Sequence, residues 1–144
     1  GLGAPFWDSD IRGGFYGLTQ DSSIQDMVTA CFNSVAFQTK EITSILEKYD
    51  IKVSSLLVDG GMVKNKTFCQ ILANSLEKEI LQPQNVESTA LGACIVAMAS
   101  SGNDLNNIIA LDMDIFKPNV ENTISIKKSY HEWKSYLIHS MRPK

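Results

Sequence analysis

A glycine pair between an apolar run and a helix-like segment is the stretch of this chain best suited to chemistry. Gly60 and Gly61 follow the run 56–58 and precede Asn65 by four residues. Glycine lets the backbone approach a ligand closely, because it has no Cβ and permits positive φ. A helix that begins near Asn65 would direct unpaired N–H groups toward the same space. Taken alone, however, the pattern is more typical of a tight turn than of a ligand site.

The polar residues around these glycines have more than one possible use. The amide of Asn65 can donate and accept hydrogen bonds toward a ligand, and asparagine is also a favoured N-cap residue, so Asn65 can serve both purposes. Asp59 precedes the pair, where an aspartate commonly fixes the following backbone, and we assign it no catalytic role. Arg12 suits a phosphate contact and a turn-bridging position equally well, so it receives no role.

The cysteines and histidines do not follow a disulfide or metal-binding pattern. Cys31, Cys69 and Cys94 are an odd set without paired spacing, which argues against a disulfide framework and a zinc knuckle. We expect buried, reduced thiols in a cytoplasmic protein. His131 and His139 have no carboxylate or cysteine at ligand spacing, so we expect them at the surface or partly packed, with no metal site.

The composition is that of a globular domain with a substantial core. The chain has 144 residues, of which 44% are hydrophobic, and its net charge is −3. Proteins that bind nucleic acid usually carry a basic face, so we expect no nucleic-acid partner. The longest apolar run, 91–99, is too short to cross a bilayer, and the start lacks a signal-peptide pattern, so we expect no membrane association.

Hydrophobic periodicity predicts an alternation of strands and helices. Strands are expected over 14–19, 53–58 and 79–82, and helices over 23–49, 65–78, 88–101 and about 127–141, with a short helix near 105–110. Such an order is typical of α/β folds with parallel strands, whose ligands lie beyond the carboxyl ends of the strands. This edge of the sheet is where Gly60, Gly61 and Asn65 would lie.

Details of the predicted helices can be tested as well. Ser22 and Gln25 match a capping box at the start of the first helix, and Lys48 suits the dipole at its end. Gly102 suits the residue after the third helix. The small residues in 89–93 would let that helix lie close against the sheet or the preceding turn.

Six motifs in order, spread over nearly the whole chain, carry a family resemblance. The first, Gly-Leu-Gly-Ala-Pro-Phe-Trp-Asp over 1–8 with Arg12-Gly13, is similar to the G-L-x-A-P-Y-W-[DE]-x₃-A-R-G run of the glycerol kinases, which belong to a wider family of carbohydrate kinases. The other five lie at 13–30, 35–39 (Val-Ala-Phe-Gln-Thr), 58–65 (Val-Asp-Gly-Gly through Asn), 89–93 (Thr-Ala-Leu-Gly-Ala) and 116–133. Asn33 departs from the family pattern, which has an acidic residue there.

The resemblance implies a ribonuclease-H-like, actin-like ATPase fold in which residues 1–144 are the C-terminal part of the nucleotide-binding domain, with a mixed sheet and helices on both faces. It implies an ATP- and Mg²⁺-dependent kinase that converts glycerol to glycerol 3-phosphate. Gly60, Gly61 and Asn65 would bind the adenosine side of ATP. The chain begins with Gly1 in dense sequence, and the catalytic base and phosphate loops are expected upstream of residue 1, so we expect these residues alone to be inactive.

Two alternatives remain beside this interpretation. One is a kinase of another sugar or polyol. The other is a non-catalytic remnant that acts as an oligomerisation or binding module. Strands expected upstream of residue 1 would leave an exposed sheet edge, and such edges pair with other chains, so we expect a homo-oligomer, with strand exchange as one route to it.

Overall fold

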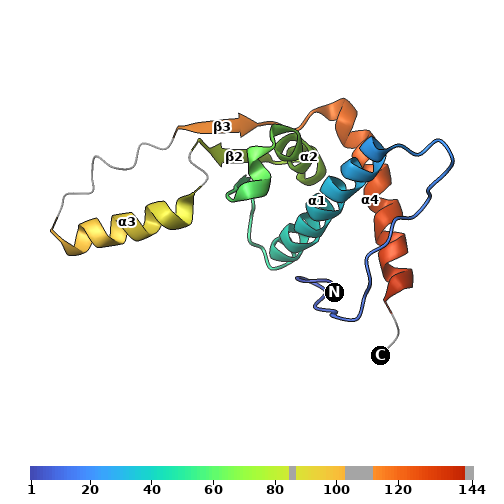
Figure 1. Cartoon of the computed structure of the whole chain (residues 1–144), viewed down its shortest axis with the longest axis horizontal. Helices are drawn as coiled ribbons and strands as arrows, with labels where there is room; N and C mark the ends of the chain where they lie inside the picture. The colour runs from blue at the N-terminus through green and yellow to red at the C-terminus, as the bar shows by residue number, and fades with distance from the viewer. Residues whose placement is uncertain (85–86, 103–111, 142–144) are drawn as a thin grey trace.

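The computed structural model describes residues 1–84, 87–102 and 112–141 (Figure 1). Most of its helices and strands match predicted ones, but the strand over 113–116 was not predicted. The described elements in chain order are α1 (Ile24–Lys48), β1 (Ser55–Leu57), the single-turn 3₁₀ helix η1 (Gly61–Lys64), α2 (Lys66–Leu76), β2 (Glu79–Pro83), α3 (Ser88–Ser100), β3 (Met113–Phe116) and α4 (Val120–Ser140). The predicted helix near 105–110 lies outside the described residues.

The three strands form a mixed sheet in the order β1-β2-β3. β1 and β2 run parallel, as expected for strands joined by a helical crossover. β3 returns antiparallel to β2, with Leu81 opposite Ile115. The α/β class and the mixed sheet are thus confirmed.

The two faces of this sheet have different surroundings. Leu56, Ile80 and Phe116 form one row across the strands, and this row packs against the hydrophobic core, with Ile80 fully buried. On the other face, Leu57 and Ile115 flank Leu81 and are 59% and 55% exposed. The described helices therefore cover one face, whereas we expected helices on both.

α2 is the centre of the hydrophobic core. Its buried side chains contact η1, β2 and α1, and α4 also packs against it, beside α1 (Figure 1). The buried cluster consists of Ala36, Val63, Phe68, Cys69, Leu72, Ala73, Leu76 and Ile80. Burying a leucine or phenylalanine side chain stabilises the fold by about 1.5–3 kcal/mol, so α2 fixes the positions of the elements around it.

A polar cluster joins α1 to α4 beside this core. Glu41 accepts hydrogen bonds from Tyr130 Oη and from Lys134 Nζ, the latter at 2.7 Å, and its side chain is 12% exposed. Burial alone would raise the pKa of the Glu41 carboxyl, but the hydrogen bonds from Lys134 and Tyr130 and the charge of Lys134 outweigh it and hold this pKa below its usual range. Burial, followed by the Glu41 contact, raises the pKa of Tyr130.

The start of α1 differs from the prediction by one residue. Its capping box uses Ser23 and Asp26, where we expected Ser22 and Gln25. Ser22 instead accepts a hydrogen bond from Thr19 N at 2.9 Å, which closes the turn before the helix. Asp26 is a better partner than Gln25 here, because its carboxylate also complements the positive end of the helix dipole. Lys48 lies in the last turn, as predicted.

Residues 14–19 do not form the predicted strand. A strand needs a neighbour for its backbone hydrogen bonds, and no described strand lies beside this segment. Its one ordered aromatic contact is to α4, where Tyr16 stacks on Tyr136 at 4.7 Å between ring centroids and shares a 2.8 Å hydrogen bond with Ser140 Oγ. The segment therefore lies as an extended arm along α4.

α3 also departs from the prediction. We expected its small residues to pack against the sheet or the preceding turn, but none of its residues is buried. Figure 1 shows it projecting from the body, and it makes no extensive contact with another described element. Gly102 follows it with φ +76°, as predicted for a residue beyond a helix C-terminus. None of the helices in the described ranges has the length and apolarity needed to span a bilayer.

Candidate nucleotide site

The glycine pair lies at the carboxyl end of β1, where the backbone turns into η1. Gly60 has φ +101°, a conformation that favours glycine because a side chain there would be strained. Its N–H donates to Asp59 Oδ1 at 2.7 Å. Asp59 thus fixes the turn, as predicted.

Gly61 lacks the left-handed backbone conformation that favours glycine at position 60. Its φ lies outside the left-handed range, and a Cβ built on it would have no atom within 4 Å. Neither backbone strain nor packing within the described chain therefore excludes a side chain there. The open space in front of Gly61 is available to a group that approaches the backbone closely.

Asn65 is the N-cap of α2, which is the structural role that the sequence predicted for it beside ligand binding. Its Oδ1 accepts from Thr67 N at 2.9 Å and from Phe68 N at 3.2 Å, so both acceptor sites of this oxygen are used. The side-chain Nδ2 donates to no described residue, and Asn65 is exposed. Toward a ligand Asn65 can therefore donate but not accept, and the N–H groups of residues 67 and 68 are already bonded.

Two buried residues hold the glycine turn in place. Val63 in η1 is 4% exposed and belongs to the core cluster. The Cys69 thiol of α2 is fully buried and donates to the Val63 carbonyl at 3.2 Å. Burial raises the pKa of Cys69, which keeps it a thiol. We did not anticipate this role, because the hydrogen bond joins a side chain to a backbone six residues away.

Two exposed ion pairs flank the turn. Lys64 Nζ lies 3.2 Å from Glu87 Oε1, which links η1 to the start of α3. Lys66 Nζ lies 2.8 Å from Asp114 Oδ2 on β3. The hydrogen bond and negative charge of Asp114 raise the pKa of Lys66. Both ammonium groups already have carboxylate partners, so neither is an unpaired cation for a phosphate.

The other residues that the sequence analysis considered for a functional role lie outside the glycine turn. Arg12 Nη1 donates to the carbonyls of Ser9 and Asp10 at 3.2 and 3.0 Å, which is the turn-bridging alternative. His131 and His139 are exposed, as expected. Cys31 and Cys94 are also exposed, so our expectation of buried thiols is correct for Cys69 only; all three are free thiols, without a disulfide.

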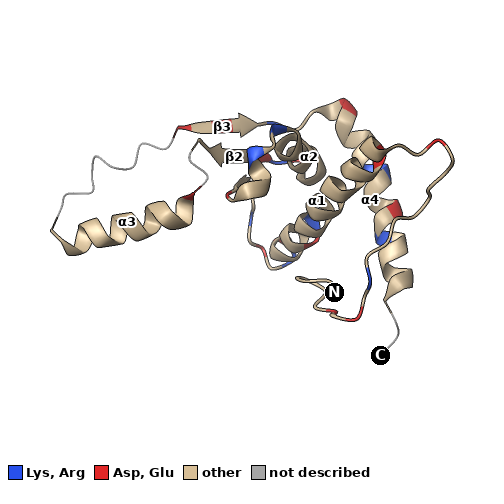
Figure 2. Ribbon diagram, viewed as in Figure 1, with Lys and Arg blue, Asp and Glu red and all other residues tan. Residues whose placement is uncertain are grey.

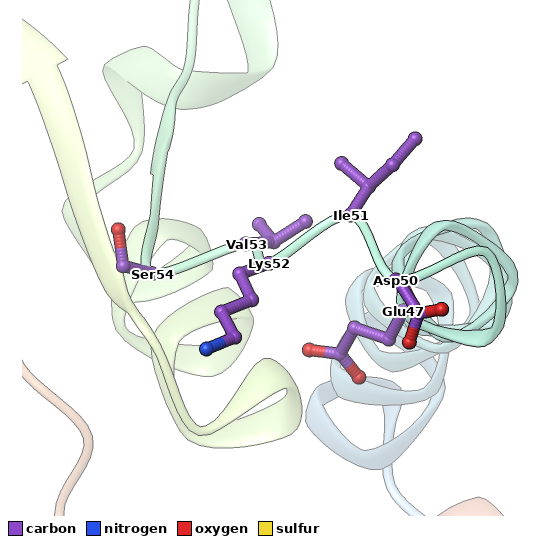
Figure 3. Close-up of a pocket in the computed structure, with 6 residues that line it drawn as sticks. All are labelled: Glu47, Asp50, Ile51, Lys52, Val53 and Ser54. Carbon is purple, nitrogen blue, oxygen red and sulfur yellow. The ribbon is translucent and has the colours of Figure 1, made fainter.

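Two hollows of the described surface lie elsewhere. Figure 3 shows a pocket of about 410 Å³ in the link between α1 and β1, at the opposite end of β1 from the glycines. A second groove of about 660 Å³ runs between the N-terminal arm, α1 and α4. Neither includes Gly60, Gly61 or Asn65, which lie together on an open edge of the sheet.

A known protein family matches most of this sequence. Residues 1–101 match the family described as the FGGY family of carbohydrate kinases, C-terminal domain. The chain belongs to this family. The matched region contains α1, the glycine turn, α2 and all of α3, whereas β3 and α4 lie beyond it.

Curated relatives in the FGGY family carry the name glycerol kinase. The enzyme from Marinomonas sp. (strain MWYL1) is 46% identical over 67% of this chain and 20% of its own length. The enzyme from Haloferax volcanii is 36% identical over 98% of this chain and 28% of its own length. This chain thus spans about a fifth to three tenths of the relatives it matches.

Solved FGGY structures share the fold. Plasmodium falciparum glycerol kinase, determined with ADP, superposes with a TM-score of 0.79 and 28% identity, over 100% of this chain and 30% of that protein. A ligand-bound xylulose kinase from Lactobacillus acidophilus gives 0.74 and 26%, over 92% of this chain and 28% of that protein. These neighbours confirm the predicted actin-like ATPase fold for the region that this chain represents.

Proposed function

We propose that this chain supplies the adenosine side of the ATP site of a glycerol kinase. The observation that carries the proposal is Gly61, where neither strain nor packing requires glycine and open space lies before the backbone. A flat nucleoside fits this arrangement, because it can lie against bare backbone. The relatives named glycerol kinase support the choice of glycerol over another sugar or polyol as phosphoryl acceptor, and the ADP in the P. falciparum structure supports a nucleotide.

Each proposed contact has a defined chemical role. Gly60 sets the turn, Gly61 offers its backbone to the base, and Asn65 Nδ2 donates to an acceptor on the base or ribose. Mg²⁺ bound with ATP would supply charge neutralisation at the phosphates, and the residues of the glycine turn would hold the nucleoside rather than the metal. Transfer of the terminal phosphoryl group to a glycerol hydroxyl depends on positioning and charge neutralisation. The base and phosphate loops belong to the rest of the kinase, so residues 1–144 alone are inactive.

The proposal extends to the organisation of the chain. Residues 1–144 are part of one C-terminal nucleotide-binding domain, and the packing of α4 on α1 and α2, although α4 lies beyond the matched region, supports this assignment. The free thiols suit a reducing compartment, so we place the protein in the cytoplasm. The uncovered row of Leu57, Leu81 and Ile115 supports self-association of this chain when it is alone.

A calorimetric titration with ATP tests the site on the chain itself. The wild type should bind in the millimolar range, because only part of the pocket is present. Gly61→Ala should abolish measurable binding and leave the free energy of unfolding within about 0.5 kcal/mol, since the new methyl group meets open space. Wild-type binding that persists in Gly61→Ala would remove Gly61 from the site.

A pair of variants separates the two roles of Asn65. Asn65→Asp keeps an N-cap acceptor and should leave the melting temperature almost unchanged, but it loses the N–H donor and should weaken ATP binding. Asn65→Ala should weaken binding and also cost about 1 kcal/mol of stability. Equal ATP affinity in the wild type and Asn65→Asp would show that Asn65 acts only as a cap.

A further inference from the structure

The backbone carbonyl of Val63 lies at the break between η1 and α2. In a continuous α-helix it would accept a hydrogen bond from the N–H four residues later, at Thr67. Thr67 N instead donates to Asn65 Oδ1 at 2.9 Å, because Asn65 caps α2. The cap thus takes away the donor that Val63 O would have in a continuous helix. Val63 is buried, and a buried carbonyl without a donor is unfavourable.

The thiol of Cys69 supplies a donor in its place. Its Sγ lies 3.2 Å from Val63 O, and Cys69 is fully buried. Burial, and then the charge of Asp114, raise the pKa of Cys69, so the proton stays on the sulfur at neutral pH. Gln82 Oε1 on β2 lies farther from the same sulfur, at 3.9 Å. A thiol has one proton, so Val63 O, the nearer acceptor, receives it.

Val63 lies midway between the two proposed ligand contacts. Gly61 is two residues before it, and Asn65 is two residues after it. Gly61 begins η1 and Asn65 follows its last residue, and Figure 1 shows this green single turn beside α2. A hydrogen bond to the carbonyl in the middle therefore sets how the Gly61 backbone and the Asn65 amide are placed relative to each other.

The other anchors of η1 constrain this peptide group less. The Val63 side chain is part of the core cluster, but burial of apolar surface is non-directional. The Lys64–Glu87 ion pair is exposed on both sides, and pairs of this kind contribute little. A hydrogen bond is directional, so the Cys69 thiol is the contact that orients the Val63 carbonyl.

We propose that Cys69 is a positioning residue of the nucleotide site, which acts through the Val63 carbonyl and does not itself touch the nucleotide. The inference rests on the proposed function of Gly61 and Asn65. These two contacts serve one nucleoside only when their spacing and angle match it. Cys69 holds that geometry in the free chain, so binding does not have to order the turn first.

Hydrogen exchange tests the positioning without any nucleotide. Asn65 N donates to Met62 O at 3.2 Å across η1, so its exchange rate reports on this turn. Cys69→Ala should speed exchange of this N–H about threefold to tenfold. Cys69→Ser keeps a donor and should exchange within about twofold of wild type. Equal exchange in wild type and Cys69→Ala would overturn the proposal, since the turn would then be held without the thiol.

Titration with ATP, followed by NMR, tests the effect on the site. Cys69→Ala should raise the Kd for ATP about threefold to tenfold, and Cys69→Ser should restore it to within about twofold of wild type. Ala73→Gly is the matched control, because it weakens α2 one turn further along and removes no donor to η1. It should leave the Kd within about twofold of wild type. Equal weakening by Ala73→Gly and Cys69→Ala would overturn the proposal, because general loss of stability would then explain both.

The same titration distinguishes this inference from the proposed function. ATP binding that Gly61→Ala abolishes and Cys69→Ala leaves unchanged would overturn the inference alone. A wild-type chain without Gly61-dependent ATP binding would overturn the proposed function, and the inference with it.

Discussion

α2 and α3 both follow a strand, yet they differ in what surrounds them. Of the 11 residues of α2, those buried are Phe68, Cys69, Leu72, Ala73, Asn74, Ser75 and Leu76. None of the 13 residues of α3 is buried. Figure 2 shows that α3 carries no charge between its two ends, so it has no polar face to offer to water.

The difference shows what an apolar pattern does and does not determine. The apolar residues of α2 recur at helical spacing and specify one buried face. Other elements of this chain cover that face. α3 is apolar around its whole circumference, which is typical of a helix enclosed by other structure. No described element packs extensively against it, so apolar residues there predict a helix but not a core.

The largest expected effect comes from the centre of α2. Leu72 is 3% exposed within the core cluster. Leu72→Ala should lower the free energy of unfolding by about 2–5 kcal/mol, because it removes buried surface and leaves a cavity. Urea denaturation followed by circular dichroism measures this loss. A change below about 1 kcal/mol would contradict the central position of α2.

A smaller effect is expected where α1 and α4 meet beside α2. Glu41→Gln removes the charge that Lys134 and Tyr130 bind, and it should cost about 1–3 kcal/mol at neutral pH. Because the folded pKa of Glu41 is lowered, its contribution is present above the ordinary glutamate pKa of about 4.3 and is lost as the pH falls through the lowered value.

The pH dependence supplies the control for this variant. Between neutral pH and about pH 3, wild type should lose more stability than Glu41→Gln, so the two denaturation midpoints should converge in acid. Asp26→Asn serves as a comparison, because it removes a carboxylate at the exposed start of α1. The pKa of Asp26 is also lowered, by its hydrogen bonds with Ser23. Parallel curves for wild type and Glu41→Gln would show that the carboxylate is not stabilised by folding.

The smallest effect is expected on α3. Val96 is 70% exposed, and Val96→Ser should change the free energy of unfolding by less than about 0.5 kcal/mol. The same change should reduce aggregation, because it interrupts an exposed apolar surface. Light scattering and urea denaturation measure the two quantities. A loss above about 1 kcal/mol would show that α3 is packed in this chain in solution, and the contrast with α2 would disappear.

Local chemistry explains which features of the sequence were predictable. The N-cap at Asn65, the turn fixed by Asp59 and the glycine after α3 depend on residues within a few positions of one another, and the structure confirms all three. The strand expected at 14–19 depends on a neighbour that local sequence cannot supply, and it is absent.

The candidate site also has features that depend on local sequence and features that depend on tertiary packing. Its residues 60, 61 and 65 share one turn, and the family motif that spans this turn led us to propose them as a site. The residues that hold this turn were not found, because the Cys69–Val63 hydrogen bond and the Lys64–Glu87 ion pair depend on tertiary packing. Sequence also left the amide of Asn65 free to donate or accept, and only the geometry of the α2 cap decides between them.

That cap has a consequence for molecular recognition. An asparagine amide can usually rotate by half a turn and exchange its oxygen for its nitrogen, so it tolerates either polarity in a partner. In Asn65 such a rotation would turn NH₂ toward two backbone N–H groups and break both hydrogen bonds, at a cost of about 1 kcal/mol each. Helix α2 thereby locks the polarity of the side chain, and a molecule that meets this edge of the sheet must present a lone pair to it.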